Sequence, residues 1–130
     1  MTTWRLVYYR DEAGRYPVRE SVAHLDEDEQ VKVRFDLNTL RDFGLELGAP
    51  YVRSIGGKLW ELRTAGQVQH RILYFAVEGQ RFMLLHAFTK KTPKTPPAEI
   101  ETARRRMAVY LDRIRAAADQ EHNKRRGRHE

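Results

Sequence analysis

The sequence of 130 residues contains no cysteine, which excludes disulfide bonds, thiolate metal sites and a thiol nucleophile. It also has no apolar run approaching the ~18 residues that a membrane-spanning helix needs, so we expect no contact with a membrane. The first residues, MTTWR, lack the apolar stretch of a signal peptide, which predicts a cytoplasmic protein. At this length we expect a single domain.

What the sequence has in excess is positive charge. Lys and Arg number 24 against 18 Asp and Glu, a net charge of +6. Residues 1–50 carry 7 basic and 10 acidic side chains, a net −3, whereas residues 51–130 carry 17 and 8, a net +9. This asymmetry favours a polyanionic partner such as a nucleic acid, although a solvated, arginine-rich surface would have the same composition.

The hydrophobic pattern predicts an α+β domain over residues 1–118. Strands of alternating or two-sided apolar character, joined by short turns, predict an antiparallel meander. Residues 119–130 have no apolar side chain, which predicts a disordered basic tail. The elements expected, in order, are a strand at 4–9, helices at 17–24 and 27–47, strands at 51–55, 58–64, 69–77 and 81–88, and a helix from 97 onward.

The long helix carries signals at both of its ends. Asp26 has the chemistry of an N-cap, and Glu29 completes a pair of the capping-box type. Gly48 followed by Pro50 predicts the end of the same helix.

Two arginines on neighbouring strands form the first candidate site. Residues two apart in a strand share a face, so Glu61 and Arg63 share one, and a short turn brings Arg63 close to Arg71. Like charges on adjacent strands repel, and a phosphate held between two guanidinium groups would explain their placement. An ion pair with Glu61 or Glu78 is the alternative interpretation. The loop after the last strand, which we place at the other end of the sheet, adds Lys90, Lys91 and Lys94.

Two residues are candidates for proton transfer. His86 titrates near neutral pH, and a structural histidine is the alternative interpretation. Glu61 is the second candidate, again with an ion pair as the alternative.

No metal-binding motif or glycine-rich phosphate loop is present. RNA cleavage without a metal uses the 2′-hydroxyl as nucleophile, so the protein must supply an acid, a base and positive charge. A sufficient set is Glu61 or His86 with Arg63, Arg71, Lys90 and Lys91.

Three segments share a recognisable pattern: KLWELR at 58–63, HRILY at 70–74 and LHAFTKKTPKTP at 85–96. Together they resemble the phage-derived, Gp49-like and HigB-type branch of the RelE/ParE toxin superfamily, over about residues 4–115. The resemblance implies a RelE-like fold, with a twisted, mainly antiparallel sheet, two N-terminal helices and a C-terminal helix. It also implies a type II toxin that cleaves mRNA on the ribosome and inhibits translation. The implied partner is a cognate antitoxin, usually a helix-turn-helix DNA-binding protein, and no cofactor is implied.

The resemblance assigns roles to individual residues. Arg71 matches the family's arginine that contacts the scissile phosphate. Lys91 falls where RelE has a second catalytic arginine, and Lys90 falls where RelE has a lysine. Contacts with mRNA or ribosomal RNA are expected from five basic side chains, Lys58, Lys90, Lys94, Arg104 and Arg105.

The sequence departs from RelE at the acid and the base. RelE has lysines where this chain has Leu59 and Glu61, and its late tyrosine has no counterpart at residues 96–97. HigB-type relatives use other acid–base residues, histidine among them, so both His86 and Glu61 remain open. The alternative functions are a non-catalytic module that binds RNA or antitoxin, and a ParE-like gyrase poison on the same fold.

Overall fold

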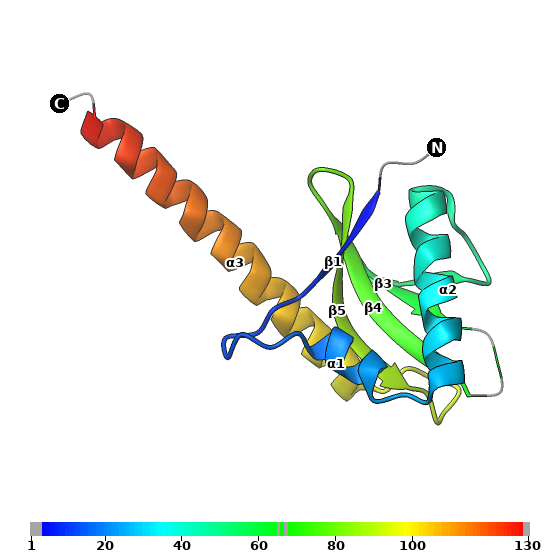
Figure 1. Cartoon of the computed structure of the whole chain (residues 1–130). Helices are drawn as coiled ribbons and strands as arrows, with labels where there is room; N and C mark the ends of the chain where they lie inside the picture. Colours follow the sequence, from blue (N-terminus) through cyan, green and yellow to red (C-terminus); the bar gives the residue numbers. More distant parts are fainter. Residues whose placement is uncertain (1–3, 65, 67, 129–130) are drawn as a thin grey trace.

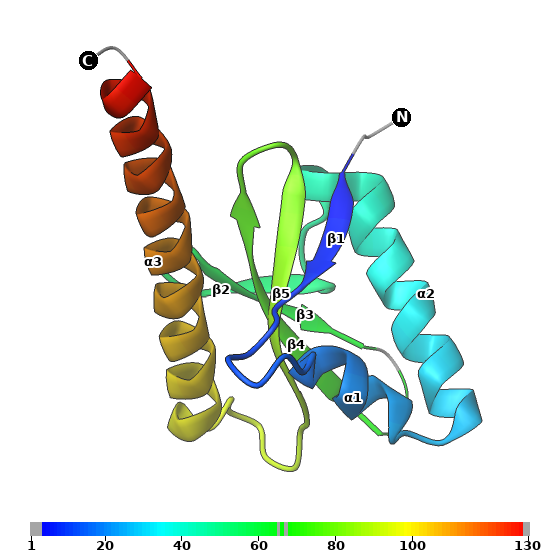
Figure 2. The same ribbon diagram turned by 60° about the vertical axis from the view of Figure 1, so that its left-hand side comes forward.

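A five-stranded sheet forms the centre of the molecule, with helices on both of its faces (Figures 1 and 2). The computed structural model describes residues 4–64, 66 and 68–128. The strand order is β1-β5-β4-β3-β2, in which β1 runs parallel to β5 and the other neighbours are antiparallel. The predicted α+β fold and the meander are therefore confirmed. The strands are β1 (Arg5–Tyr8), β2 (Val52–Gly56), β3 (Leu59–Arg63), β4 (His70–Val77) and β5 (Arg81–Thr89).

Alternating side chains give the sheet two separate hydrophobic cores. In β4, Ile72 and Tyr74 face the core beneath α1 (Pro17–Ala23) and α2 (Glu27–Phe43). Leu73 and Phe75 of the same strand face α3 (Pro97–Arg128). Figure 2 shows the resulting layers, with α3 on one side of the sheet and α2 on the other. A strand that is buried on both faces reads as a continuous apolar run, as β4 does.

The ends of α2 differ from the prediction. Asp26 occupies the N-cap position, but its side chain makes no capping hydrogen bond. Glu29 does not complete a capping box, because its Oε2 lies 3.0 Å from Nε2 of His70 on β4. The helix ends at Phe43, Gly44 with φ 59° is its C-cap, and a 3₁₀ turn (Gly44–Glu46) follows, so the predicted end at Gly48 is wrong. A β-carbon at Gly44 would lie 2.5 Å from Cδ1 of Trp4, which explains why only glycine fits there.

Helix α3 runs far beyond the sheet that it covers (Figure 1). Its first half packs against β5 through Ile100, Ala103 and Met107, whereas residues 112–127 are exposed. The described tail residues continue the helix to Arg128, unlike the disordered tail expected from the sequence. Ion pairs one turn apart, such as Arg125 with Glu121 at 3.7 Å, stabilise such a polar helix. In the part of the chain that the structure describes, no helix is long and apolar enough to span a membrane.

Candidate functional site

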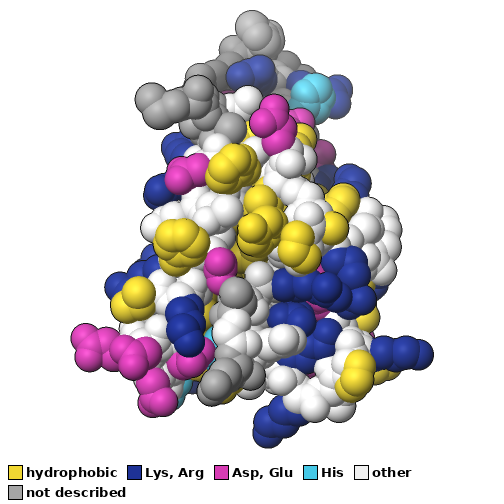
Figure 3. Space-filling view, turned by 90° about the vertical axis from the view of Figure 1, so that its right-hand side faces the viewer, with side chains coloured by type: hydrophobic (Ala, Val, Ile, Leu, Met, Phe, Trp, Pro, Cys, Tyr) yellow, Lys and Arg dark blue, Asp and Glu magenta, His cyan; other side chains and the backbone are white. Residues whose placement is uncertain are grey.

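An open cleft of about 840 Å³ lies where β3 ends, β4 begins and the loop leaves β5. Four basic side chains line it, Arg63, Arg71, Lys90 and Lys91. Lys and Arg side chains gather on one part of the face drawn in Figure 3. The rest of the cleft wall includes Pro50, Tyr51, Val68 and Pro93.

Strand pairing brings the basic side chains together. Arg63 and Arg71 are direct register partners across β3 and β4, as the sequence predicted. The backbone N–H of Lys90 donates to the carbonyl of Gln69 at 2.7 Å, which holds the start of the loop beside the start of β4. Lys90 and Lys91 therefore lie at the same end of the sheet as Arg71, and their predicted place at the other end is wrong.

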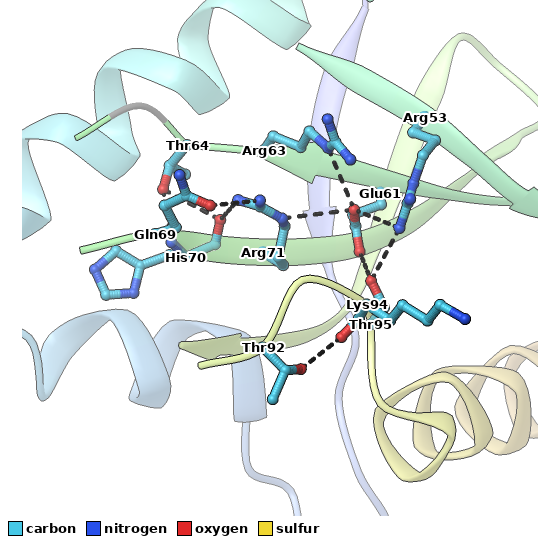
Figure 4. Close-up of polar contacts among 10 residues, drawn as sticks. All are labelled: Arg53, Glu61, Arg63, Thr64, Gln69, His70, Arg71, Thr92, Lys94 and Thr95. Carbon is cyan, nitrogen blue, oxygen red and sulfur yellow. Dashed lines mark hydrogen bonds and ion pairs between the residues drawn. The ribbon is translucent and has the colours of Figure 1, made fainter. Parts of the chain in front are cut away.

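Glu61 is the counter-charge of the arginine cluster (Figure 4). Its side chain has no exposed surface, and its Oε1 lies 3.2 Å from Nη2 of Arg53, 3.6 Å from Nε of Arg63 and 3.5 Å from Nε of Arg71. The hydroxyl of Thr95, in the loop before α3, donates to its Oε2. Glu61 does not line the cleft, so its geometry fits the ion-pair interpretation rather than that of a base. The carboxylate of Glu61 carries one negative charge and the three arginines carry three positive charges, so the cluster has a net positive charge.

Arg71 is held in a fixed orientation at the cleft. Its side chain is 5% exposed, and Nη1 donates to the carbonyl of His70 at 3.1 Å. Nη2 donates to Oε1 of Gln69 at 2.8 Å. Burial lowers the pKa of Arg71, the charge of Glu61 opposes that shift, and the charges of Arg63 and Arg53 add to it. The guanidinium is thus preorganised before any ligand arrives, which is what stabilisation of developing charge requires.

Lys90 is a half-buried lysine of the cleft beside Arg71. Burial lowers the pKa of Lys90, and repulsion from the Arg71 charge lowers it further. Lys91 beside it is exposed. The sequence identified Lys90 only as positive charge, because its closeness to Arg71 depends on how the loop returns to β4. An ammonium group with a lowered pKa next to a phosphate site is a candidate proton donor.

His86 lies outside this cleft. Its Nε2 contacts Oε2 of Glu99 on α3, and its Nδ1 lies 3.1 Å from Nη1 of Arg106. Burial lowers the pKa of His86, an effect that the bond to Glu99 opposes. The structure therefore places His86 as a link between β5 and α3, which fits the interpretation of a structural histidine.

The other predicted RNA contacts are spread over the surface. Lys58 lines a separate groove with Trp60, and Lys94 is exposed in the loop before α3 without lining the cleft. Arg104 and Arg105 are exposed on α3. Among the described residues, no group of three or more His, Asp or Glu side chains is arranged to hold a metal ion. Sequence reasoning did not identify three residues that contribute to the site, Arg53, Gln69 and Thr95. No sequence motif marks them, because strand pairing and the course of the loops bring them to the site.

Comparison with known proteins identifies the family of this chain. The family model described as phage-derived protein Gp49-like (DUF891) matches residues 20–108. A search of curated proteins finds no match. The matched region contains α2, β2 to β5 and every residue that lines the cleft. The chain therefore belongs to the phage-derived Gp49-like family, within the RelE/ParE toxin superfamily.

Proposed function

We propose that this chain is the toxin of a type II toxin–antitoxin system, an endoribonuclease that cleaves mRNA on the ribosome and so inhibits translation and growth. Membership of a toxin family of the RelE/HigB type, whose members are typically ribonucleases, supports the class. The observation that carries the proposal is the cleft itself, where Arg63 and Arg71 are paired in register beside Lys90 and Lys91. Glu61 balances only one of the three arginine charges that it contacts, so a surplus of positive charge remains, and an RNA phosphate would balance it.

The proposed reaction needs no metal. The 2′-hydroxyl of the substrate gives up its proton to solvent water, which reaches the open cleft, and its oxygen attacks the adjacent phosphorus. The bond from phosphorus to the 5′-oxygen breaks, and a 2′,3′-cyclic phosphate forms. Arg71 and Arg63 stabilise the extra negative charge on the phosphorane oxygens. Lys90, whose pKa burial and Arg71 lower, donates the proton that the leaving 5′-oxygen takes up. Lys91 adds positive charge at the exposed rim.

The proposed partners are the ribosome and an antitoxin. The exposed cations Lys58, Lys94, Arg104 and Arg105 do not line the cleft, so we assign them to ribosomal RNA rather than to the scissile phosphate. A cognate antitoxin, of the helix-turn-helix kind, would inhibit the toxin until the antitoxin is removed. A small helix-turn-helix gene next to this one would support that assignment.

The test is induction of the gene without an antitoxin, followed by primer extension on translated mRNA. Intact protein should arrest growth and leave cleaved transcripts, whereas Arg71→Ala should lower cleavage by roughly 10²-fold or more, because one preorganised cation is lost. Lys91→Ala, at an exposed position that tolerates truncation, should also lower cleavage.

The matched control is Lys124→Ala, which removes an exposed lysine far along α3. It should cleave like the intact chain. Uncut transcripts with damaged DNA would instead identify a gyrase poison, and normal growth with intact transcripts would identify a non-catalytic module. Either result contradicts the proposed reaction.

A further inference from the structure

Tyr51 is an aromatic residue that the fold leaves half uncovered at the cleft. It lies between α2 and β2, 50% of its surface is exposed, and it belongs to neither hydrophobic core. It is the aromatic side chain among the described residues that line the cleft. Single exposed rings are common on protein surfaces, and what distinguishes Tyr51 is its place in the wall of the basic cleft.

The backbone of Tyr51 is attached to the arginine cluster. Its carbonyl accepts a hydrogen bond from the backbone N–H of Arg63 at 2.8 Å. Its own N–H donates to the carbonyl of Gly48 at 3.0 Å, which closes the turn before β2. The main chain therefore holds Tyr51 next to Arg63, and its side chain lines the cleft.

The cleft combines two kinds of surface. Arg63, Arg71, Lys90 and Lys91 supply positive charge, and the apolar part comes from Pro50, Tyr51, Val68 and Pro93. A nucleotide has the same two parts, a phosphate and a flat base. Stacking of a base on an aromatic ring is tolerant of sequence, because every base has a π-face.

We infer that Tyr51 is a base-stacking residue, which receives a base of the RNA whose phosphate lies on Arg63 and Arg71. This inference rests on the proposed function and extends it from the phosphate to the base. Trp60 is also partly exposed, at 40%, but it points to the opposite face of the sheet and lines the groove with Gly44 and Phe82. Tyr51 is thus the exposed ring on the side of the sheet where the phosphate would bind.

The experiment measures binding of a short 2′-O-methyl RNA, which cannot be cleaved by 2′-oxygen attack, carrying the fluorescent base 2-aminopurine. The full-length protein should quench the fluorescence, because stacking on an aromatic ring quenches this base. Tyr51→Phe keeps the ring and should bind and quench like the intact chain. Tyr51→Leu keeps an apolar side chain without the ring, so it should bind roughly tenfold more weakly and lose the quenching.

Two controls separate stacking from other effects. Phe35→Ala removes a ring that is 71% exposed on α2, away from the cleft, and should leave binding unchanged. An oligonucleotide with an abasic site in place of 2-aminopurine should bind Tyr51→Leu and the intact chain equally, because it offers no base to stack.

The failures of the two proposals are distinguishable. If Tyr51→Leu binds and quenches like the intact chain, while Arg71→Ala binds weakly, the base site is wrong and the phosphate site stands. If Tyr51→Leu lowers the affinity for the abasic oligonucleotide as much as the affinity for the base-containing one, Tyr51 maintains the structure of the cleft. The inference is then also wrong. If the intact chain binds neither oligonucleotide, both the base site and the proposed RNA cleft are contradicted.

Discussion

At the scale of single residues, the positive cleft depends on one buried carboxylate. Glu61 contacts three arginines, two of which, Arg53 and Arg63, keep 43% and 34% of their side-chain surface exposed. Arg71 keeps only 5%. A buried charge that loses its partner is far more costly than an exposed one, which water can stabilise. The contribution of Glu61 to stability therefore acts mainly through Arg71.

Glu61→Gln should lower the free energy of unfolding by about 3 kcal/mol, since it preserves the shape of the side chain but leaves Arg71 buried without a counter-charge. Urea unfolding measures the change. Glu78→Gln, in the exposed turn between β4 and β5, is the matched control and should change the free energy by less than about 0.5 kcal/mol. Equal stability of the two variants would contradict the role assigned to Glu61.

His86 gives the protein a dependence of stability on pH. Because burial lowers its pKa in the folded state, the unfolded chain binds a proton at His86 at a higher pH than the folded chain does. The stabilisation is therefore complete above the unfolded pKa of about 6.5 and is lost as the pH falls through that value toward the lower folded pKa.

We expect the free energy of unfolding of the intact chain to fall more steeply between pH 7.5 and pH 5.5 than that of His86→Gln, because the variant has no group to protonate there. Urea unfolding at a series of pH values measures both slopes. His122→Gln, at an exposed position on α3, should keep the slope of the intact chain. Parallel curves for the intact chain and His86→Gln would contradict a depressed pKa at His86.

At the scale of elements, the end of α2 is determined by a contact with a distant strand. Gly44 has φ 59°, and Trp4, next to β1, lies against it while stacking on Phe82 with ring centroids 4.2 Å apart. An added β-carbon meets both the unfavourable backbone conformation and the Trp4 ring. The sequence pattern favoured Gly48 instead, because the next strong helix-breaking signal, Pro50, follows it.

Gly44→Ala should therefore lower the free energy of unfolding by about 2 kcal/mol, from the left-handed backbone and the displaced ring together. Gly48→Ala is the matched control, because a β-carbon there meets nothing within 4 Å. It should be neutral or slightly stabilising. Thermal unfolding of the pair measures the difference, and an equal loss in both variants would contradict both the backbone strain and the Trp4 contact as its causes.

At the scale of the whole molecule, local features were predictable and distant ones were not. The meander and the pairing of Arg63 with Arg71 follow from alternation and short turns, so the sequence was sufficient for both. The parallel pairing of β1 with β5 and the return of Lys90 to Arg71 depend on contacts that no local pattern encodes. The same limit applies to His86, whose partners Glu99 and Arg106 come from the packing of α3.

The uneven charge of the sequence can be assigned to particular elements of the structure. The net +9 of residues 51–130 includes the four cations of the cleft, whereas the acidic start of α2, Glu27 to Glu29, carries part of the net −3 of residues 1–50. If the cleft binds RNA phosphates, the logarithm of the association constant for single-stranded RNA should fall linearly with the logarithm of salt concentration, with a slope of about −0.7 for each phosphate neutralised.

Lys91→Ala should make that slope shallower by about 0.7, because one phosphate contact in the cleft is lost. Lys124→Ala removes the same charge from the exposed part of α3 and should leave the slope unchanged. The two variants have identical net charge, so their comparison separates a local contact from the field of the whole molecule. Binding measured at several salt concentrations decides between them: equal slopes in the two variants would mean that overall charge, and not the cleft, attracts the RNA.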